Sequence, residues 1–317
     1  MYYLQRLRGL FLLLASAGLV LFASCQSEEG SGVATAPEGQ GTITFSVSNY
    51  RQVSFDDLSS SATTRATEEY VLSLANLSLT IFNAETNEQV SPTILHKSDD
   101  YDESNVKTFP QFSVTLPYGH YRVLVLGYNG SRECHITSLN HISWDDGYVP
   151  NTFLYCDEFT LDQNTSLDRT ITLKRVVAAF RLDTEDALPA ELKKMRFSSA
   201  AGGTVLDATT GFTSQNTGRT SEIVVPSVNV GKPGMFTSYL FLPSKELSTD
   251  YTVQALGNGD AVLYEKHFNN VPLRINVLTL WQGKFFTASD SGETPGVQGV
   301  FSIEWDMDWD ETLQFQP

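Results

Sequence analysis

The sequence predicts an all-β protein built from two β-sandwich domains in tandem, with a single short helix. From residue 42 onward, apolar side chains recur at every second position, for example in 42–48 and 112–117. This is the period of a strand with one buried face. The runs are rich in Val, Ile, Thr, Tyr and Phe and end at Gly, Asn, Asp or Pro. Short strands separated by such turn residues are typical of sandwiches.

An internal repeat supports the division into two domains. Segments 116–130 and 242–259 each contain Leu-Pro, then Tyr-x-Val, then Leu-Gly. Two related domains, spanning 42–175 and 176–317, would produce this repeat. The alternative is chance, because these short combinations are common in strands.

Segment 186–195 predicts the short helix. Asp186 is suited to the N-cap position, and Pro189 falls in the first turn, where its missing N–H is tolerated.

The first residues predict a secretory signal over 1–24. Arg6 and Arg8 precede an apolar run that ends in small residues just before Cys25, which is the order of such signals. The apolar run is short for a membrane span. Residues 25–41 contain few large apolar groups and predict a flexible tether.

Residues Leu21–Cys25 resemble a bacterial lipobox. This resemblance implies that acyl chains are attached at Cys25, which becomes the first residue of the mature protein and anchors it in the outer membrane. The acidic residues after Cys25 resemble the surface-export signal of Bacteroidetes lipoproteins, which implies a position on the cell surface. The alternative is an ordinary secretory signal with an incidental cysteine.

Composition and motifs argue against several functions. The net charge of −16 disfavours binding to nucleic acid. The histidines do not occur at zinc-binding spacings, and no P-loop, dinucleotide-binding or nucleophile-elbow motif occurs. We therefore expect no enzymatic activity, no metal site and no cofactor.

Two further cysteines, Cys134 and Cys156, leave two possibilities. An exported protein can form a disulfide between them, or both can be buried free thiols.

The order of several segments resembles the fimbrillin superfamily of Bacteroidales-type fimbriae. They are the lipobox, the tether, and segments 63–88, 116–130, 170–183 with the following 187–195, and 272–286. The resemblance implies two transthyretin-like β-sandwiches and a role as a stalk, tip or anchor subunit. In stalk members a protease cuts after an Arg that follows the first strand, and a strand from the next subunit fills the groove that opens.

The resemblance assigns that cut to the Arg65–Ala66 bond. Arg65 lies in a Ser/Thr/Ala-rich stretch of the kind in which proteolysis succeeds. Cleavage would release the strand around 43–47 together with the lipid. The alternative is that Arg65 is an ordinary loop residue and the protein keeps its anchor.

The C-terminal end predicts a strand after a linker at 287–299. Its apolar residues alternate strictly with polar ones, as in a half-buried strand. Such a strand could be donated to a neighbouring subunit, or it could complete its own sandwich. The alternating residues are Phe301, Ile303, Trp305, Met307 and Trp309.

These observations lead to a structural hypothesis. The chain is a fimbrial subunit at the cell surface, assembled or anchored by strand exchange with other subunits and contributing to adhesion to a host protein or glycan. The alternatives are a tip adhesin on the same fold and a tethered lipoprotein that binds glycan as a monomer. In the glycan-binding case, Trp144, Trp281, Trp305 and Trp309 would supply the sugar-stacking surfaces.

Overall fold

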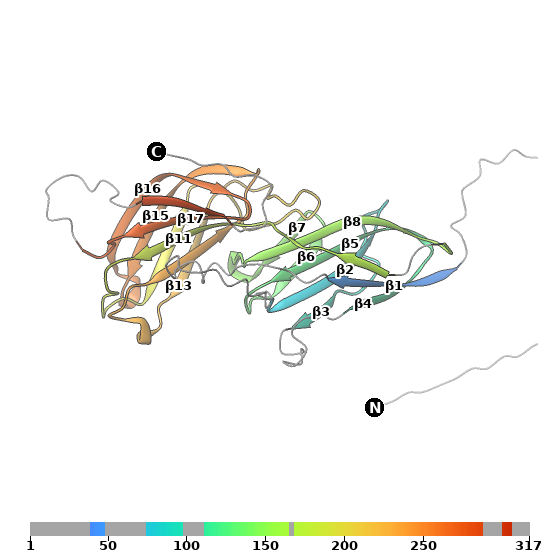
Figure 1. Cartoon of the computed structure of the whole chain (residues 1–317), viewed down its shortest axis with the longest axis horizontal. Coiled ribbons are helices and arrows are strands. Elements are labelled where there is room, and N and C mark those ends of the chain that lie inside the picture. The colour runs from blue at the N-terminus through green and yellow to red at the C-terminus, as the bar shows by residue number, and fades with distance from the viewer. Residues whose placement is uncertain (1–38, 48–73, 98–110, 165–167, 288–299, 306–317) are drawn as a thin grey trace, which may run out of the picture. The chain divides into compact units, whose positions relative to one another are not determined.

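The computed structural model describes residues 39–47, 74–97, 111–164, 168–287 and 300–305. They are almost entirely β-structure, arranged as antiparallel and mixed sheets (Figure 1). Residues 37–317 form one compact unit. The described residues contain no helix that is long and apolar enough to cross a membrane.

The first sandwich consists of a three-stranded sheet in the order β4-β1-β9 and a five-stranded sheet in the order β10-β8-β5-β2-β3. Both sheets contribute apolar side chains to one core, which includes Phe45, Leu79 and Val123. The β6–β7 hairpin lies between β5 and β8 in the chain. The bounds are β1 Gln40–Val47, β2 Asn76–Asn83, β3 Ile94–Lys97, β4 Phe112–Pro117, β5 Gly119–Tyr128, β6 Cys134–Ser138, β7 His141–Trp144, β8 Thr152–Leu161, β9 Asp168–Ile171 and β10 Lys174–Arg175.

The second sandwich pairs two four-stranded sheets, in the orders β14-β11-β17-β18 and β13-β12-β15-β16. Its core includes Phe180, Phe197 and Trp281, and its aromatic rings meet edge to face, as in the Phe180–Phe268 pair at 5.5 Å. The bounds are β11 Ala178–Thr184, β12 Lys194–Ser199, β13 Arg219–Val224, β14 Met235–Leu240, β15 Glu246–Leu256, β16 Val262–Arg274, β17 Val277–Gly283 and β18 Val300–Trp305.

A third apolar cluster lies on the outer face of the five-stranded sheet. Alternate residues of β2 and β5, such as Phe82 and Leu124, point away from the first core and into this cluster. The β6–β7 hairpin covers them, together with residues from the second half of the chain that include Leu206 and Phe241. Ile142 and Leu206 join the two halves through a reciprocal pair of backbone hydrogen bonds of 3.0 and 2.8 Å.

The helix expected at 186–195 is wrong. Residues 186–193 form turns and irregular backbone, and β12 begins at Lys194. Local backbone donors bind carbonyl groups of distant segments: the Leu188 N–H donates to Lys232 and the Lys193 N–H to Leu256. Leu188 and Leu192 are buried in the second core. Tertiary hydrogen bonds thus replace the i→i−4 bonds that a helix would need. The helical structure of the described residues is limited to three 3₁₀ turns of three residues each. They are Asp145–Gly147, Ser227–Asn229 and Asn258–Asp260.

The place of β1 in the first core leads to a stability prediction. Phe45 is fully buried and packs edge to face on Phe159 at 5.6 Å. We expect Phe45→Ala to lower the free energy of unfolding by about 3–5 kcal/mol, because a large cavity remains. Denaturant unfolding of the full chain measures the change.

Thr44→Ala is the matched control on the other face of the same strand. Thr44 is part-exposed and its hydroxyl meets that of Ser113 at 3.2 Å, so the loss should stay below about 1 kcal/mol. Equal effects for the two variants would contradict the placement of β1.

Candidate functional site: the first strand and the C-terminal strand

The first strand lies in the middle of its sheet. β1 pairs antiparallel with β4, from Gln40 opposite Pro117 to Phe45 opposite Phe112. On its other side it pairs in parallel with β9, from Thr44 opposite Asp168 onward. A central strand of this kind carries hydrogen bonds on both edges.

β1 also supplies one row of the first core. Ile43, Phe45 and Val47 are buried, while Thr42 and Thr44 face the other way and meet hydroxyl groups of β4. This is the alternation of a half-buried strand. If β1 were absent, β4 and β9 would flank a gap one strand wide, floored by the apolar residues of the opposite sheet.

The second sandwich repeats this topology. β11 takes the place of β1, because it pairs antiparallel with β14 and in parallel with β17. The opposite sheets have matching orders, β8-β5-β2-β3 and β16-β15-β12-β13, and every pairing within them is antiparallel. The repeated segments 116–130 and 242–259 fall at the β4–β5 and β14–β15 connections, so they occupy equivalent places.

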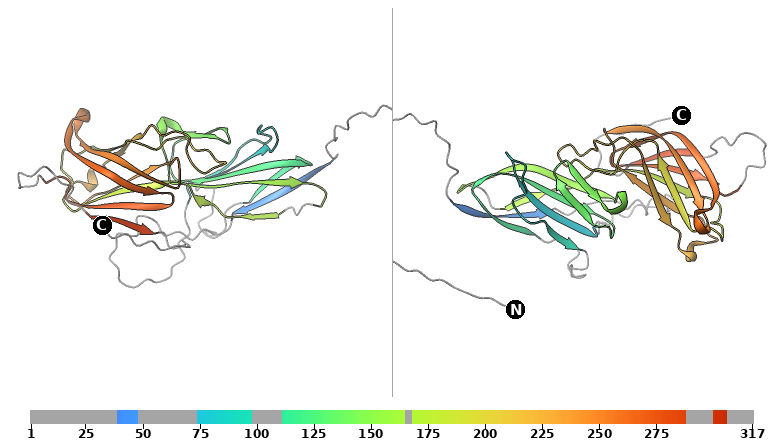
Figure 2. Two further views of the ribbon diagram at one scale, coloured as in Figure 1. Left: turned by 90° about the horizontal axis from the view of Figure 1, so that it is seen from above. Right: turned by 180° about the vertical axis from the view of Figure 1, so that it is seen from behind.

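The second sandwich has one strand more than this pattern requires. β18 pairs antiparallel with β17, with Val300 opposite Gln282 and Trp305 opposite Val277, and forms the edge of the sheet (Figure 2). The C-terminal strand expected from the sequence therefore exists as a strand over 300–305 and pairs within its own chain. The structure describes the backbone of Phe301, Ile303 and Trp305 and leaves their side chains undescribed. Met307 and Trp309 lie outside the described residues.

Asp186 holds the chain at the point where it leaves β17. Its Oδ1 accepts the N–H of Phe285 at 2.9 Å, and its Oδ2 accepts those of Phe286 at 2.6 Å and Thr287 at 2.9 Å. Charge-assisted bonds of this kind are stronger than neutral ones. The residue expected to cap a helix instead fixes the segment that leads to β18.

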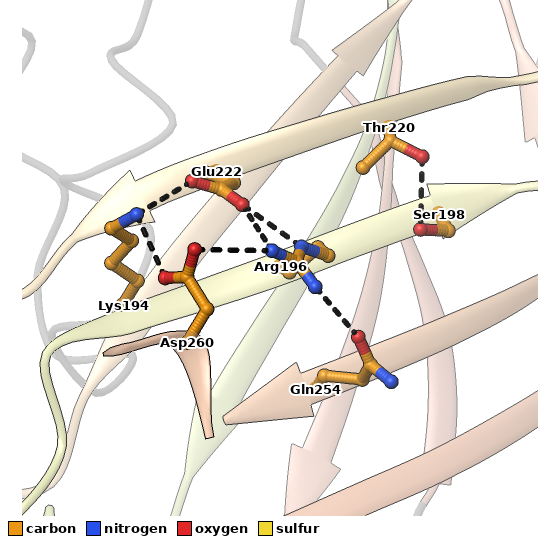
Figure 3. Close-up of polar contacts among 7 residues, drawn as sticks. All are labelled: Lys194, Arg196, Ser198, Thr220, Glu222, Gln254 and Asp260. Carbon is orange, nitrogen blue, oxygen red and sulfur yellow. Dashed lines mark hydrogen bonds and ion pairs between the residues drawn. The ribbon is translucent and has the colours of Figure 1, made fainter. Parts of the chain in front are cut away.

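The outer face of the sheet β13-β12-β15 carries a network of ion pairs (Figure 3). Lys194 Nζ lies 3.0 Å from carboxylate oxygens of both Glu222 and Asp260, and Arg196 also binds Glu222. Hydrogen bonds from Arg196 and Lys194 lower the pKa of Glu222. Hydrogen bonds to Asp260 and Glu222 raise the pKa of Lys194. The network therefore balances its own charges.

Cys134 and Cys156 are free thiols in the structure, which is the second of the two possibilities that the sequence left open. Both cysteines pack against the third apolar cluster. Burial raises the pKa of Cys134 to about 12 and that of Cys156 to about 11. These thiols are therefore protonated near neutral pH and poorly nucleophilic.

The structure describes the side chains of two of the four tryptophans considered for glycan stacking. Trp144 and Trp281 are buried in separate apolar clusters, so neither presents a ring face to a sugar, and the expectation is wrong for these two. Within the described part of the chain, no group of three or more His, Cys, Asp or Glu side chains could hold a metal ion. Cys25, Arg65 and Ala66 lie outside the described residues.

Two features were missed by the sequence reasoning. The role of Asp186 depends on residues about 100 positions away, and no local pattern marks it. The second buried face of β2 could have been predicted from the sequence. Phe82 lies on the face of β2 opposite Leu79 and Ile81, so large apolar residues occur on both faces of this strand.

The fold defines an all-β protein of two sandwiches with the same strand order and one additional C-terminal strand. A family model described as a family of unknown function, DUF6562, matches residues 34–315, and the chain belongs to this family. No curated protein sequence matches the chain.

Several solved structures resemble the chain. A fimbrial assembly protein from Parabacteroides distasonis shares 13% identity, over 84% of this chain and 96% of that one, with a TM-score of 0.43. The tip fimbrial protein Mfa3 from Porphyromonas gingivalis shares 11% identity, over 83% and 99%, with a TM-score of 0.37. The fimbrial anchor protein Mfa2 from the same organism shares 10%, over 84% and 97%, also at 0.37.

These three structures are fimbrial proteins, the class to which the sequence resemblance pointed.

The Asp186 contacts lead to a second prediction. We expect Asp186→Asn to lower the free energy of unfolding by about 1–2 kcal/mol, because three charge-assisted hydrogen bonds are weakened. Amide hydrogen exchange at residues 285–287 should also become faster. Glu185→Gln is the control, because Glu185 is exposed. Unchanged exchange at 285–287 in Asp186→Asn would contradict the role of Asp186.

Proposed function

We propose that this protein is a structural subunit of a cell-surface fimbria, exported as a lipoprotein through Cys25 and assembled by exchange of β-strands. The single observation that carries the proposal is the position of β18 in the repeated topology. After β9 the chain passes through β10 and enters β11, the first strand of the second sandwich. After β17 it passes through 284–287 and reaches β18. In chain order, β18 follows β17 as β11 follows β9 and β10, so β18 has the chain position of a first strand.

β18 pairs at the edge of β17, while β1 and β11 each lie between two neighbouring strands. An edge strand on a linker is suited to pairing with another chain. The sequence alternation at Phe301, Ile303 and Trp305 is the alternation by which β1 fills the first core.

The receiving place in this proposal is the position of β1. A cut at Arg65–Ala66 would separate β1 from β2, because Arg65 lies between Val47 and Asn76 in the chain. The gap between β4 and β9 would then need an apolar strand, because exposure of the core to water is unfavourable. Other copies of this chain or related subunits are the partners, and the assembly would contribute to adhesion.

Processing at Arg65 is tested by the mass and N-terminal sequence of protein recovered from the cell surface. We expect the wild-type chain to begin at Ala66 without lipid. Arg65→Ala should begin at acylated Cys25 and be absent from polymers, because β1 then stays in place. Arg51→Ala is the control for loss of another arginine from the same part of the sequence. Polymers built from chains that begin at Cys25 would contradict processing.

Strand donation is tested in the C-terminal strand. Ile303→Asp should abolish polymers that resist denaturant, because the charge would be buried in the receiving core without a partner. Ser302→Asp is the matched control, since Ser302 belongs to the opposite phase of the strand, and it should assemble as the wild type does. Denaturing gels of unheated samples separate the two outcomes. Normal assembly of Ile303→Asp would contradict donation.

A further inference from the structure

Exposed apolar side chains occur at two places in the second sandwich, where β13 passes into β14 and where β16 begins. Eight large apolar residues of the described chain are exposed, and six of them lie at these two places. The most exposed are Val224 at 71%, Val228 at 69% and Val262 at 52%. The six residues, which we call the apolar end, are Val224, Val228, Met235, Val262, Leu263 and Tyr264.

Strand register places these residues at one end of the sandwich. Lys194 is opposite Val224 on one side and Leu256 on the other, and Leu256 is in turn opposite Val262. In the facing sheet, Met235 at the start of β14 is opposite Asp183, near the end of β11. Val228 lies in the connection from β13 to β14. The six residues therefore surround the end at which β11 finishes.

The ion-pair network lies between Val224 and Val262 at this end. Glu222 and Asp260, which lie two residues before Val224 and Val262, are joined through Lys194 (Figure 3). Exposed apolar groups beside charged side chains that are already paired give the mixture of apolar and polar contacts that docking surfaces use. Single exposed apolar residues are ordinary, but a group of six at one end of a sandwich is not.

The C-terminal arm, by which we mean the chain from Lys284 to the end of β18, begins at the same end of the second sandwich. Gln282 near the end of β17 is opposite Asp183, and Asp186 binds the backbone of the next residues up to Thr287. The ring of Phe286 meets that of Tyr264 edge to face at 5.4 Å. The arm thus starts beside one of the six apolar residues.

The length of the linker restricts where a receiving partner can sit. A chain extends at most about 3.5 Å per residue, so residues 288–299 reach at most roughly 40 Å from Thr287. A chain that takes up β18 must therefore bind its first residue within that distance of Thr287, which lies at the apolar end. Apolar contact there would hold it near the strand and raise the effective concentration of the strand.

We propose that the apolar end is the docking surface for a second copy of this chain, the copy that receives the C-terminal strand. The inference rests on the proposed function and adds to it the surface that brings the two copies together before the strands exchange. Docking speeds assembly, while the exchanged strand makes the assembly resistant to denaturant.

The test compares rates of assembly for the uncleaved, lipid-bearing precursor, purified from membranes in mild detergent before processing and then treated with trypsin. In the test variant, Val224→Glu is combined with Val262→Glu, because these exposed sites tolerate charge without loss of folding. The matched control combines Val90→Glu with Leu95→Glu, which add the same charge at the other two large apolar residues that are exposed in the described part of the chain. Thermal unfolding midpoints establish that all chains are folded.

We expect the test variant to assemble at least about tenfold more slowly than the wild type, because two carboxylates would be desolvated in the contact. The control should assemble at the wild-type rate. The milder pair Val224→Ser with Val262→Ser should slow assembly in the same direction, and it serves if the double Glu variant does not fold. Assembly of the test variant at the wild-type rate would overturn the inference, as would equal slowing in the control.

The strand variant Ile303→Asp separates the two proposals. If Ile303→Asp is inactive and the apolar-end variant is normal, strand exchange stands and the docking surface is wrong. If Ile303→Asp assembles normally and the apolar-end variant is slow, the docking surface stands and strand exchange is wrong. A wild-type chain that remains monomeric after cleavage overturns both.

Discussion

Each sandwich depends on a first strand that lies in the middle of its sheet. β1 and β11 each bind one neighbour antiparallel and the other in parallel, and each fills a row of its core. Burial of these apolar rows stabilises both cores, at roughly 25 cal/mol per Å² of apolar surface. If such a strand is removed, another strand must take its place in the core. A strand from another chain can do so only if its apolar and polar residues alternate in the same way.

The two sandwiches differ in how their outer faces are used. In the first, the five-stranded sheet is apolar on both faces, and the third cluster covers its outer face with residues such as Trp144 and Phe241. In the second, the corresponding outer face carries the network of Lys194, Arg196 and Glu222. The same strand order thus supports a face that holds the two halves of the chain together and a face that remains at the surface.

Buried polar groups reinforce the junction between the halves. Arg175 donates from Nε to Asn151 Oδ1 and from Nη1 to Asn276 Oδ1, both at 2.9 Å, and its guanidinium lies over the ring of Phe153. Asn276 belongs to the turn between β16 and β17. A guanidinium with several directed donors specifies a geometry that apolar packing alone does not. The same part of the chain that ends the first sandwich therefore also binds the second.

The sequence by itself determined several of the strands and their buried face, because a period of two along the chain is a local property. Ile43, Phe45 and Val47 are buried as their alternation predicts, and 301–305 is a strand as its alternation predicts. The tertiary structure decided the rest. Asp186 binds the backbone of 285–287 instead of starting a helix, and Leu206 covers the sheet that contains Leu124. These contacts join residues far apart in the chain, and their geometry depends on the register and packing of whole sheets, which no local pattern encodes.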